Sequence, residues 1–415
     1  MKLNTEHFDV VVIGGGASGM MAAGVAGQKG KKVLILEKNK NLGEKLKITG
    51  GGRCNVTNAE FNIREFLKIY GDGGKFLNSA FAKFSAKDTF EFFESKGLPL
   101  VVQARKRAFP KTEKALDVFN VLNKFIISNG VKIKTNCGVK KILHEKGHIT
   151  GLETKDGTYT ANSYILATGG LSHPETGSTG DGFKWLADLG HTVKKPTPTI
   201  VPLAVEEEWI KMLSGISLSF MKITFYLGGV KKFKKIGKIL FTHFGLSGPL
   251  ILNSSSEVSE LLHEGIVTAL IDAYPDTDHG ALEKKIIKTF DENKNKSLKN
   301  IFKEIVPEGM SPGVMTLLPQ INFETKVHSI TKEERKIIVD LLKALPVTIT
   351  ELMGYDRAVV ADGGVDLKEI DTKTMQSLKL DNLFVTGDLL HINRPSGGYS
   401  LQLCWTTGFV AGESA

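Results

Sequence analysis

A glycine-rich turn between a short apolar segment and a helix-like segment constrains the fold of this chain more than any other feature. Residues 8–13 (FDVVVI) are an apolar, β-branched run typical of a buried parallel strand, and the sequence GGGASG follows at residues 14–19. Residues 20–29 are rich in Ala and Met, as in a helix, and a second apolar strand at residues 33–36 ends before Glu37. This order of strand, glycine turn, helix, strand and acid predicts a dinucleotide-binding domain.

Each part of the turn has a physical role. Gly14, Gly16 and Gly19 permit a tight turn and let the backbone approach a pyrophosphate, while the helix N-terminus offers unpaired amides and a positive dipole end. Glu37 would accept hydrogen bonds from an adenosine ribose, which disfavours a nucleotide with a 2′-phosphate there. The alternative interpretation is a glycine-rich turn that binds no ligand. The presence of all the flanking elements favours the nucleotide site.

Two later clusters favour FAD over NAD as the nucleotide. Residues 49–55 (TGGGRCN) contain three consecutive glycines, whose backbone could pack against a flat ring; the alternative is a mobile hinge. An apolar strand at residues 382–386 (NLFVT) precedes Gly387 and Asp388, and the acid is placed to bind ribityl hydroxyls. A helix that begins at Gly397–Gly398 would direct its N-terminus at the pyrimidine edge of a flavin, which gains negative charge on reduction.

Five segments together resemble the YhiN/BaiN-like family of NAD(P)/FAD-dependent oxidoreductases: VVIGGGASGMMAA, KLKITGGGRCNVTN, ATGGLSHPETGSTGDGF, ILFTHFGLSGP and TGDLLHINRPSGGYSLQ. The resemblance covers nearly the whole chain and implies an FAD-binding domain interrupted by an insert. Together with the fingerprint and the two clusters it gives these candidate cofactor-binding residues: Gly14, Gly15, Gly16, Ala17, Ser18, Gly19, Glu37, Lys38, Gly51, Gly52, Arg53, Cys54, Asn55, Thr57, Val139, Thr168, Gly169, Gly387, Asp388, Gly397, Gly398, Tyr399 and Ser400.

The chain departs from that family beside the expected flavin edge. The family leads us to expect an acidic or small residue near residues 391–394 (HINR) and an Asn where Ser400 stands, so its substrate preference is not carried over. More distantly, residues 176–191 (TGSTGDGFKWLADLGH) resemble the fumarate-reductase-like flavoproteins, which deliver hydride to activated carbon–carbon double bonds.

The predicted class is α/β, with a Rossmann-like FAD-binding domain interrupted by an insert of β-strands and helices. Residues 164–167 (YILA) are a buried strand that returns to the nucleotide domain at Thr168, and the character of the chain changes after KKPTP at residues 194–198. Strand-like segments near residues 347–353 and 358–361 lead back to the final strand. We therefore expect a nucleotide domain at residues 1–195 and 345–415 and an insert at residues 196–344, rich in strands over 196–255 and helical over 256–344.

The densest basic stretch is residues 229–239 (GVKKFKKIGKI), with five lysines and no acid in a chain of net charge +9. One interpretation is a patch for nucleic acid or another acidic surface. The other, which we favour, is a solvated strand and turn, because no stacking aromatics or RNA-module motif accompany the lysines. A nucleic-acid partner is therefore the less favoured alternative, and a small-molecule substrate the favoured one.

Cysteine content and hydropathy exclude several classes of protein. Cys54, Cys137 and Cys404 are far apart and form no CxxC, which excludes a redox-active pair and a four-cysteine iron–sulfur site, and no metal is expected. No apolar run approaches the ~18 residues of a membrane span, so no membrane partner is expected. Glu6 and Asp9 argue against a signal peptide, and the expected location is a reducing cytoplasm.

Catalytic side chains are harder to assign, because flavin carries the hydride chemistry while protein groups position, protonate and tune. The candidates are Arg53, His173, His391, Arg394 and the pair Arg105 and Arg107. Cys54 is expected to be a small buried thiol and His243 a structural residue. Arg107 either binds an anionic substrate or forms a surface ion pair.

The sequence thus predicts an FAD-dependent oxidoreductase that takes hydride from NAD(P)H and reduces a small molecule, with an activated carbon–carbon double bond as one acceptor. No second GxGxxG follows a strand, so a nicotinamide donor would dock directly on the flavin face. Two alternatives stay open: an FAD-dependent RNA-modifying protein, and a non-catalytic flavin-binding redox sensor.

Overall fold

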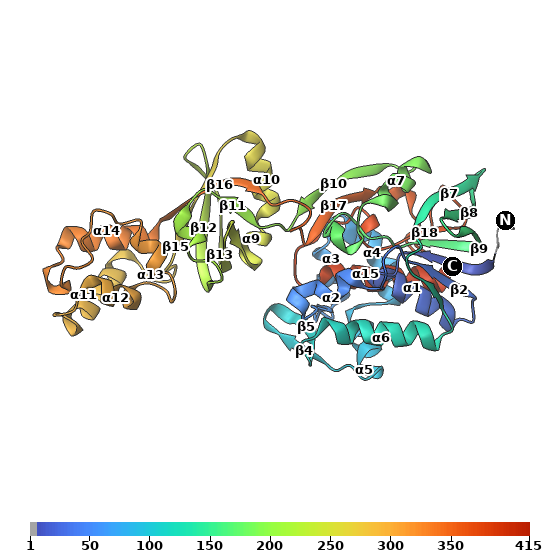
Figure 1. The fold of residues 1–415 in the computed structure, drawn as a ribbon, viewed down its shortest axis with the longest axis horizontal. Helices are drawn as coiled ribbons and strands as arrows, with labels where there is room; N and C mark the ends of the chain where they lie inside the picture. The colour runs from blue at the N-terminus through green and yellow to red at the C-terminus, as the bar shows by residue number, and fades with distance from the viewer. Residues whose placement is uncertain (1–5) are drawn as a thin grey trace. The chain divides into compact units, whose positions relative to one another are not determined.

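The computed structural model describes residues 6–415 and divides into two compact units (Figure 1). The first unit consists of the described residues up to Pro198 together with Val359–Ala415, and the second consists of Thr199–Ala358. The chain passes between the units twice, so the second unit is an insertion in the first.

A mixed sheet forms the centre of the first unit. Its strands run in the order β6-β2-β1-β9-β8-β7, and β18 also pairs with β9. The pairings among β6, β2, β1, β9 and β18 are parallel, whereas β7, β8 and β9 pair antiparallel. The strands are β1 (His7–Ile13), β2 (Val33–Leu36), β6 (Lys132–Lys134), β7 (Val139–Glu145), β8 (His148–Thr154), β9 (Gly157–Leu166) and β18 (Leu383–Val385).

The two central parallel strands are buried along almost their whole length. Val10, Val11 and Val12 of β1 have no exposed surface, and all four residues of β2 are buried. A parallel sheet covered on both faces needs apolar side chains at successive positions, which explains the continuous apolar runs in the sequence. The predicted α/β class, with a Rossmann-type nucleotide-binding domain and an insert of strands and helices, is confirmed.

Two helices of this unit pack closely through glycine. α1 (Ala17–Gln28) follows β1, and α15 (Tyr399–Ser414), at the C-terminal end of the chain, lies beside it (Figure 1). A Cβ added to Gly408 would lie 2.4 Å from the Ser18 carbonyl oxygen, and one added to Gly412 would lie 2.2 Å from that of Ala22. Glycine at both positions therefore lets α15 approach the backbone of α1.

The remaining elements of the first unit surround the main sheet. Two small sheets are present, one in the order β3-β5-β4 and one of β10 with β17. Their strands are β3 (Thr57–Asn58), β4 (Leu100–Gln103), β5 (Arg107–Pro110), β10 (Val193–Thr199) and β17 (Val360–Val365). The other α-helices are α2 (Glu44–Ile48), α3 (Ile63–Lys68), α4 (Gly73–Lys83), α5 (Ala86–Ser95), α6 (Ala115–Ser128) and α7 (Asp181–Asp188).

A closed barrel of six strands forms the centre of the second unit, in the order β11-β14-β13-β12-β15-β16. Ile223, Phe225 and Phe241 have no exposed surface and belong to its core. The strands are β11 (Leu203–Val205), β12 (Ser217–Leu227), β13 (Val230–Thr242), β14 (Gly245–Ser247), β15 (Val267–Asp272) and β16 (Leu345–Leu352).

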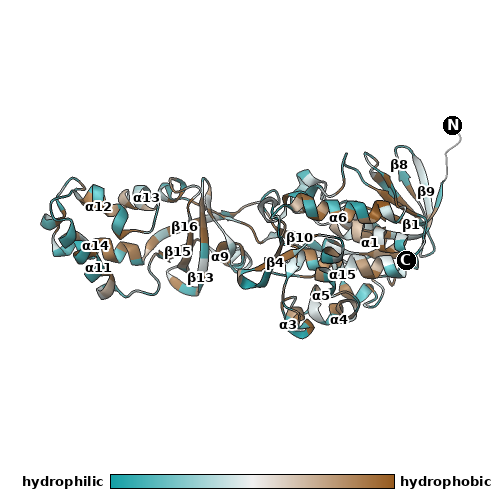
Figure 2. Ribbon diagram, turned by 90° about the horizontal axis from the view of Figure 1, so that it is seen from below, coloured by the Kyte–Doolittle hydropathy of each residue, from teal (hydrophilic) through white to brown (hydrophobic). Residues whose placement is uncertain are grey.

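Helices complete the second unit. They are α8 (Glu208–Lys211), α9 (Pro249–Leu252), α10 (Ser255–Glu264), α11 (His279–Glu292), α12 (Leu298–Ile305), α13 (Ser311–Met315) and α14 (Lys332–Lys343). α11 and α14 are amphipathic: they bury Leu282, Ile286 and Ile338, while much of their ribbon has the colour of hydrophilic residues in Figure 2.

The structure corrects one predicted domain boundary and one predicted helical segment. The prediction returns the chain to the nucleotide domain at residue 345, whereas Leu345–Leu352 is a barrel strand that pairs with β15 and β11, and the crossing falls at Val359. β15 also interrupts the segment 256–344 that is predicted to be helical. The residue pattern of a strand does not reveal which sheet the strand joins. Here β15 and β16 both belong to the closed barrel.

Within residues 6–415, no helix is both long enough and apolar enough to span a membrane. The same part of the chain holds no group of three or more His, Cys, Asp or Glu side chains arranged to bind a metal ion.

Candidate flavin site

The glycine turn after β1 is shaped by contacts that only glycine permits. A Cβ added to Gly14 would lie 2.6 Å from the Ala167 carbonyl oxygen, and one added to Gly19 would lie 2.0 Å from that of Gly14. Gly16 differs, because a Cβ there would meet no described atom within 4 Å. The described residues give α1 no side-chain cap, and its first turn has no acid, so its first amides point out unpaired. The turn can therefore receive an anion from outside.

Glu37 is held at the end of β2, directly beside this turn. Its Oε2 accepts a hydrogen bond of 2.8 Å from the Gly15 amide, and its Oε1 accepts one of 2.8 Å from the Asn39 amide. A carboxylate has about four acceptor positions, so both oxygens can still accept hydroxyl groups. The neighbouring Lys38 forms an ion pair of 2.8 Å with Asp181 in the first turn of α7, which gives this predicted residue an internal partner.

Three further predicted residues lie beside the turn and Glu37. Val139 begins β7, two residues after Cys137, whose amide donates to the Glu37 carbonyl oxygen at 2.9 Å. Thr168 and Gly169 follow β9, and a Cβ on Gly14 would lie 3.1 Å from the Thr168 Cα. Within residues 6–415 the buried Thr168 hydroxyl has no hydrogen-bond partner. A buried hydroxyl without a hydrogen-bond partner, next to a turn of the kind that binds phosphate, is expected where a bound group supplies the missing partner.

The second glycine cluster forms an open loop. Gly50, Gly51 and Gly52 have φ angles of 60°, 67° and 83°, which side-chain-bearing residues rarely adopt. A Cβ on Gly51 or Gly52 would meet no described atom within 4 Å. The loop therefore presents bare backbone on an open side, as packing against a flat ring requires.

The loop after this glycine cluster lies against the start of α15. A Cβ added to Gly398 would lie 2.3 Å from the Thr57 carbonyl carbon, so the two backbones are in contact. With the Asn55 amide oriented to satisfy both its groups, its oxygen accepts from the Gly398 amide at 2.9 Å. Thr57 donates to Gln402 Oε1 at 2.6 Å, across 345 positions of sequence. The two clusters that the sequence assigns to the flavin therefore meet in space.

Asp388 and Arg394 form a buried ion pair between β18 and α15. Arg394 is only 3% exposed, and besides Asp388 it donates to the Ser400 hydroxyl at 3.1 Å and to the Ile392 carbonyl oxygen at 2.6 Å. The sequence interpretation gives Asp388 free oxygens for ribityl hydroxyls. In the structure one of these oxygens already accepts from Arg394, so the acid also has an internal structural role.

The segment that follows β18 contacts the start of α1, directly after the glycine turn. The Thr386 hydroxyl donates to that of Ser18 at 3.2 Å, and a Cβ on Gly387 would lie 3.1 Å from the Ser18 Oγ. The predicted residues therefore form a continuous line from the N-terminus of α1, past Gly387 and Arg394, to the N-terminus of α15.

Lys45 is a residue of this region that sequence reasoning missed. Its amine donates to the Ser172 hydroxyl at 3.1 Å. Burial lowers the pKa of Lys45, and the nearby Asp388 carboxylate opposes that shift. In the sequence it is one of two lysines in the short segment KLKITGGG, and nothing there separates it from a solvated lysine. Only its place just before the glycine loop is a signal.

The predicted catalytic candidates have different surroundings in the structure. Arg53 donates to Gln103 at 2.8 Å, pairs with Glu113 and lies over the Phe109 ring at 4.4 Å. Its buried Nε has no hydrogen-bond partner among the described residues. Cys54 has no exposed surface, and burial raises the pKa of its thiol to about 12, as expected of an inert buried thiol.

The other arginines lie near α15. Arg107 pairs with Asn58 in the β3–β5 register, and the side-chain amide of Asn58 donates to the carbonyl oxygens of Arg105 and Gly397 at 3.1 and 3.2 Å. Burial, and then the charge of Arg105, lowers the pKa of Arg107. This guanidinium is half-buried and stands beside the Gly397–Ser400 loop, where it can meet an anionic or carbonyl group.

The predicted histidines His173 and His391 have different partners. His173 Nδ1 bonds to Glu175 at 2.8 Å, and His391 lies 3.3 Å from the Lys194 amine. His243 belongs to the second unit, in the turn after β13.

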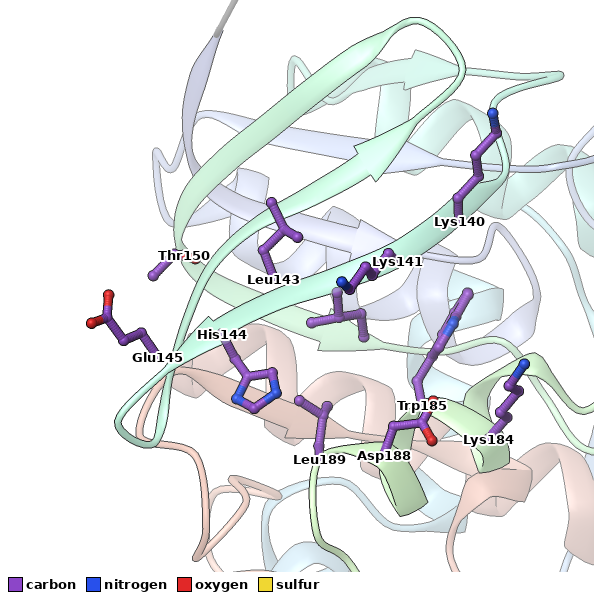
Figure 3. A pocket seen from close by; sticks show the side chains of 11 residues that line it. Lys140, Lys141, Leu143, His144, Glu145, Thr150, Lys184, Trp185, Asp188 and Leu189 are labelled. Atoms are coloured by element: carbon purple, nitrogen blue, oxygen red, sulfur yellow. The ribbon is translucent and has the colours of Figure 1, made fainter.

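A surface hollow of about 580 Å³ lies elsewhere in the first unit, between β7 and α7. Figure 3 shows Lys141 and His144 of β7 on one side of it and Trp185 of α7 on the other. None of its lining residues is a predicted cofactor contact, so it is separate from the line of residues described above.

Comparison with known proteins finds relatives along almost the whole chain. The family model described as the HI0933-like protein Rossmann domain matches residues 8–414. The chain is 28% identical over 408 residues to the 3-dehydro-bile acid delta(4,6)-reductase of Clostridium scindens, which covers 97% of this chain and 98% of that protein. It is also 28% identical over 415 residues to the ribosomal RNA dihydrouridine synthase of Haemophilus influenzae, covering 99% of each.

Solved structures share the fold at low identity. A flavocytochrome c3 fumarate reductase matches with a TM-score of 0.56 and 16% identity, over 99% of this chain and 78% of that one. The 3-ketosteroid-delta4-(5alpha)-dehydrogenase of Rhodococcus jostii matches with a TM-score of 0.54 and 14% identity, over 100% of this chain and 97% of that one.

Proposed function

Because this chain belongs to the HI0933-like family of flavin-dependent oxidoreductases, we propose that it is an FAD-dependent reductase that takes hydride from NAD(P)H. The acceptor is a carbon–carbon double bond conjugated with a carbonyl group. The observation that carries the proposal is the continuous line of residues from the open turn at Gly16, past Gly387, to the N-terminus of α15 at Gly398.

The residues along this line fit the parts of FAD in order. The amides at the start of α1, behind Gly16, hold the pyrophosphate, and Glu37 accepts from the adenosine ribose. The bare backbone of Gly51 and Gly52 packs against the ring system, and the first amides of α15 meet its pyrimidine edge. When bound, FAD supplies the two-electron carrier between a hydride donor and an acceptor.

The two groups of relatives share one kind of chemistry despite different substrates. A delta(4,6)-reductase of a 3-dehydro-bile acid and a dihydrouridine synthase both saturate a carbon–carbon double bond conjugated with a carbonyl group. Hydride addition to the β-carbon of such a bond puts negative charge on the carbonyl oxygen, which a fixed cation stabilises, and a proton taken up at the α-carbon completes the reduction. We propose that Arg107, whose strand partner Asn58 bonds to the Gly397 carbonyl oxygen, holds that oxygen, and that Lys45 near Asp388 is a second cation.

The hydride donor has no nucleotide-binding module of its own in the sequence. We propose that NAD(P)H docks transiently on the flavin ring itself, on the face that the Gly51–Gly52 backbone leaves uncovered.

The decisive experiment uses the purified protein with its bound flavin. We expect FAD, rather than FMN, to be released on denaturation, and NADH or NADPH to bleach the flavin spectrum under anaerobic conditions. Adding a cyclic α,β-unsaturated ketone should then restore the oxidised spectrum, with one saturated product formed per flavin. A protein that takes up no FAD, or a reduced flavin that only oxygen reoxidises, contradicts the proposal.

A further inference from the structure

The proposed reduction needs a proton donor as well as a hydride. Hydride adds to the β-carbon of the conjugated double bond, and the α-carbon must then take up a proton. Only the carbonyl carbon separates the α-carbon from the carbonyl oxygen, so the proton donor has to lie close to the cation that holds this oxygen. The group required is therefore an acidic side chain beside Arg107.

Tyr399 is the neighbour of Arg107 that has a proton to give. Within residues 6–415, the two groups whose charges act on Arg107 are Arg105 and Tyr399. A guanidinium group keeps its proton in proteins, so Arg105 does not serve as an acid. A phenol can give up its proton and take it back, which leaves Tyr399 as the candidate.

Backbone contacts hold Tyr399 next to the strand that carries Arg107. Tyr399 is the first residue of α15, and a Cβ added to Gly397 would lie 3.0 Å from its ring. Asn58 of β3 is the register partner of Arg107 in β5, and its amide donates to the Gly397 carbonyl oxygen at 3.2 Å. The start of α15 is thus tied through β3 to the strand of Arg107.

Aromatic packing fixes the ring of Tyr399 but leaves its hydroxyl open. The ring lies edge-to-face with that of Phe66, with centroids 5.1 Å apart, and with that of Tyr70 at 6.3 Å. Within residues 6–415, no hydrogen bond involves the Tyr399 hydroxyl, and this oxygen is not among the buried polar atoms that lack a partner. The hydroxyl is therefore accessible and can meet a ligand.

The neighbouring phenol of Tyr70 differs in both respects. Tyr70 is only 2% exposed, and its hydroxyl donates to the Tyr399 carbonyl oxygen at 2.8 Å. This hydroxyl supports the backbone at the start of α15 and is not available to a ligand. The two tyrosines belong to one aromatic cluster, and of the two only Tyr399 has an open hydroxyl.

The charges around Tyr399 suit an acid that gives up its proton and regains it. Burial, and then the Glu60 carboxylate, raises the pKa of Tyr399, so the phenol carries its proton at neutral pH. The Lys106 and Arg107 cations lower this pKa, because they favour the phenolate. The same cations therefore stabilise the phenolate that remains after the proton has left.

We propose that Tyr399 is the general acid of the reduction and delivers the proton to the α-carbon of the substrate. This inference rests on the proposed function and adds the residue that completes its chemistry. Hydride forms a bond to the β-carbon, and the π electrons of the double bond move onto the carbonyl oxygen. The enolate then takes the Tyr399 proton: the phenol O–H bond breaks, a C–H bond forms at the α-carbon and the carbonyl group returns. The phenolate regains a proton from water.

The first test compares two oxidants of the reduced flavin in the FAD-loaded protein. Tyr399→Phe removes only the hydroxyl and keeps the ring that packs on Phe66. The flavin is reduced with dithionite, so the result does not depend on the nucleotide donor, and is then mixed with 2-methylcyclohex-2-enone or with ferricyanide. Ferricyanide takes up electrons alone and needs no proton at carbon. Tyr70→Phe is the matched control, because it removes the same atom from the same aromatic cluster.

We expect Tyr399→Phe to slow reoxidation by the enone roughly 100- to 10,000-fold, the usual contribution of a general acid, and to leave reoxidation by ferricyanide unchanged. Tyr70→Phe should keep the wild-type rate with both oxidants. An unchanged enone rate in Tyr399→Phe, or equal losses with both oxidants, overturns the proposal.

The configuration of the product is a second readout. Reduction of 2-methylcyclohex-2-enone creates a stereocentre at the α-carbon, and an acid in a fixed position protonates one face of the enolate. We expect one enantiomer in excess from wild type and from Tyr70→Phe, and a lower enantiomeric excess from Tyr399→Phe, measured by chiral gas chromatography. An undiminished excess from Tyr399→Phe would mean that another group delivers the proton.

A binding measurement without turnover shows whether the site is intact. The oxygen and planar ring of 4-chlorophenolate resemble those of the enolate, and stacking on oxidised flavin produces a charge-transfer absorption band at long wavelength. We expect Tyr399→Phe to bind 4-chlorophenolate with the wild-type Kd, because Arg107 holds the oxygen. Loss of the band in Tyr399→Phe would make Tyr399 a binding residue and overturn its role as the acid.

The acid and the proposed function fail in different ways. If wild type reduces the enone and Tyr399→Phe does so equally well, the assignment of Tyr399 is wrong and the proposed function survives. If ferricyanide reoxidises the wild-type flavin but no conjugated enone does, the proposed function fails, and the role of Tyr399 fails with it.

Discussion

Arg394 and Asp388 form an ion pair whose guanidinium is almost entirely shielded from water. The two residues are six positions apart, in the segment between β18 and α15. The same guanidinium holds Ser400 and the Ile392 carbonyl oxygen, so one side chain fixes the segment that leads into α15. Arg394, the last residue of the HINR segment, thus anchors the start of α15.

Replacing Arg394 should be costly because it leaves a poorly solvated carboxylate behind. We expect Arg394→Gln to lower the free energy of unfolding by about 3–5 kcal/mol, measured by urea denaturation of the apo protein. The double variant Asp388→Asn with Arg394→Gln should lose less than the single variant, because the unpaired charge is gone. A loss below about 1 kcal/mol for Arg394→Gln would show that the pair behaves like a surface ion pair.

Gly16 and Gly14 differ in what an added side chain would meet. Gly14→Val would disturb the turn itself, whereas a side chain at Gly16 meets no described atom within 4 Å. We expect Gly16→Val to fold with an apo melting temperature near that of wild type and to retain little or no FAD, because the new methyl groups occupy the phosphate position. The matched control is Gly280→Val, in the first turn of α11, which should keep full flavin content. Normal FAD retention by Gly16→Val would place the pyrophosphate elsewhere.

Cys54 should take no part in redox chemistry despite its position beside the glycine loop. Because burial raises the pKa of this thiol to about 12, almost none of it is thiolate near neutral pH. We expect iodoacetamide to leave Cys54 unmodified in the native protein and to modify it quickly in urea, as mass spectrometry of the digested protein would show. Cys54→Ala should oxidise NAD(P)H at the wild-type rate. Rapid native alkylation would require a reactive, accessible thiol.

Lys45 should make stability depend on pH in a predictable direction. Burial lowers the pKa of Lys45 in the folded protein, so on raising the pH the folded state loses this proton before the unfolded chain does. Between the folded pKa and the unfolded value of about 10.4 the unfolded chain binds more protons, and this group's contribution to stability rises with pH. At neutral pH Lys45→Met removes the cost of a buried ammonium group and should be the more stable protein.

The advantage of Lys45→Met over wild type should therefore shrink between neutral pH and about pH 10, as measured by urea denaturation. The exposed Lys31→Met serves as the control and should differ from wild type by a constant amount. An advantage of Lys45→Met that does not change with pH would mean that the amine titrates alike in both states.

The first forty residues could be interpreted from sequence because their contacts are local. The carbonyl oxygen of Gly14 lies against Gly19, and Glu37 reaches Gly15, all within one strand–helix–strand unit. Such contacts depend on neighbouring residue types, which the sequence displays directly.

The domain boundary at residue 345 was wrong for the opposite reason. Leu345–Leu352 has the pattern of a strand, but its partners β11 and β15 lie far away along the chain. The lysines of residues 229–239 posed a similar problem. The sequence shows five of them, while only the pairing of β12 with β13 and the Lys235–Glu257 ion pair reveal which four face outward uncompensated.

Sequence patterns were enough to predict the nucleotide-binding unit and the family and to propose the residues of the candidate site, because strand, turn and helix signals arise over short stretches of chain. Three features became visible only in the folded chain: Asn55 meets Gly398, Asp388 is paired with Arg394, and the pKa of Lys45 is lowered by burial. The first and third features depend on segments more than a hundred residues apart being packed together, and the Asp388–Arg394 pair depends on water being excluded from the guanidinium. Neither the packing nor the loss of solvent is a property of any one stretch of sequence.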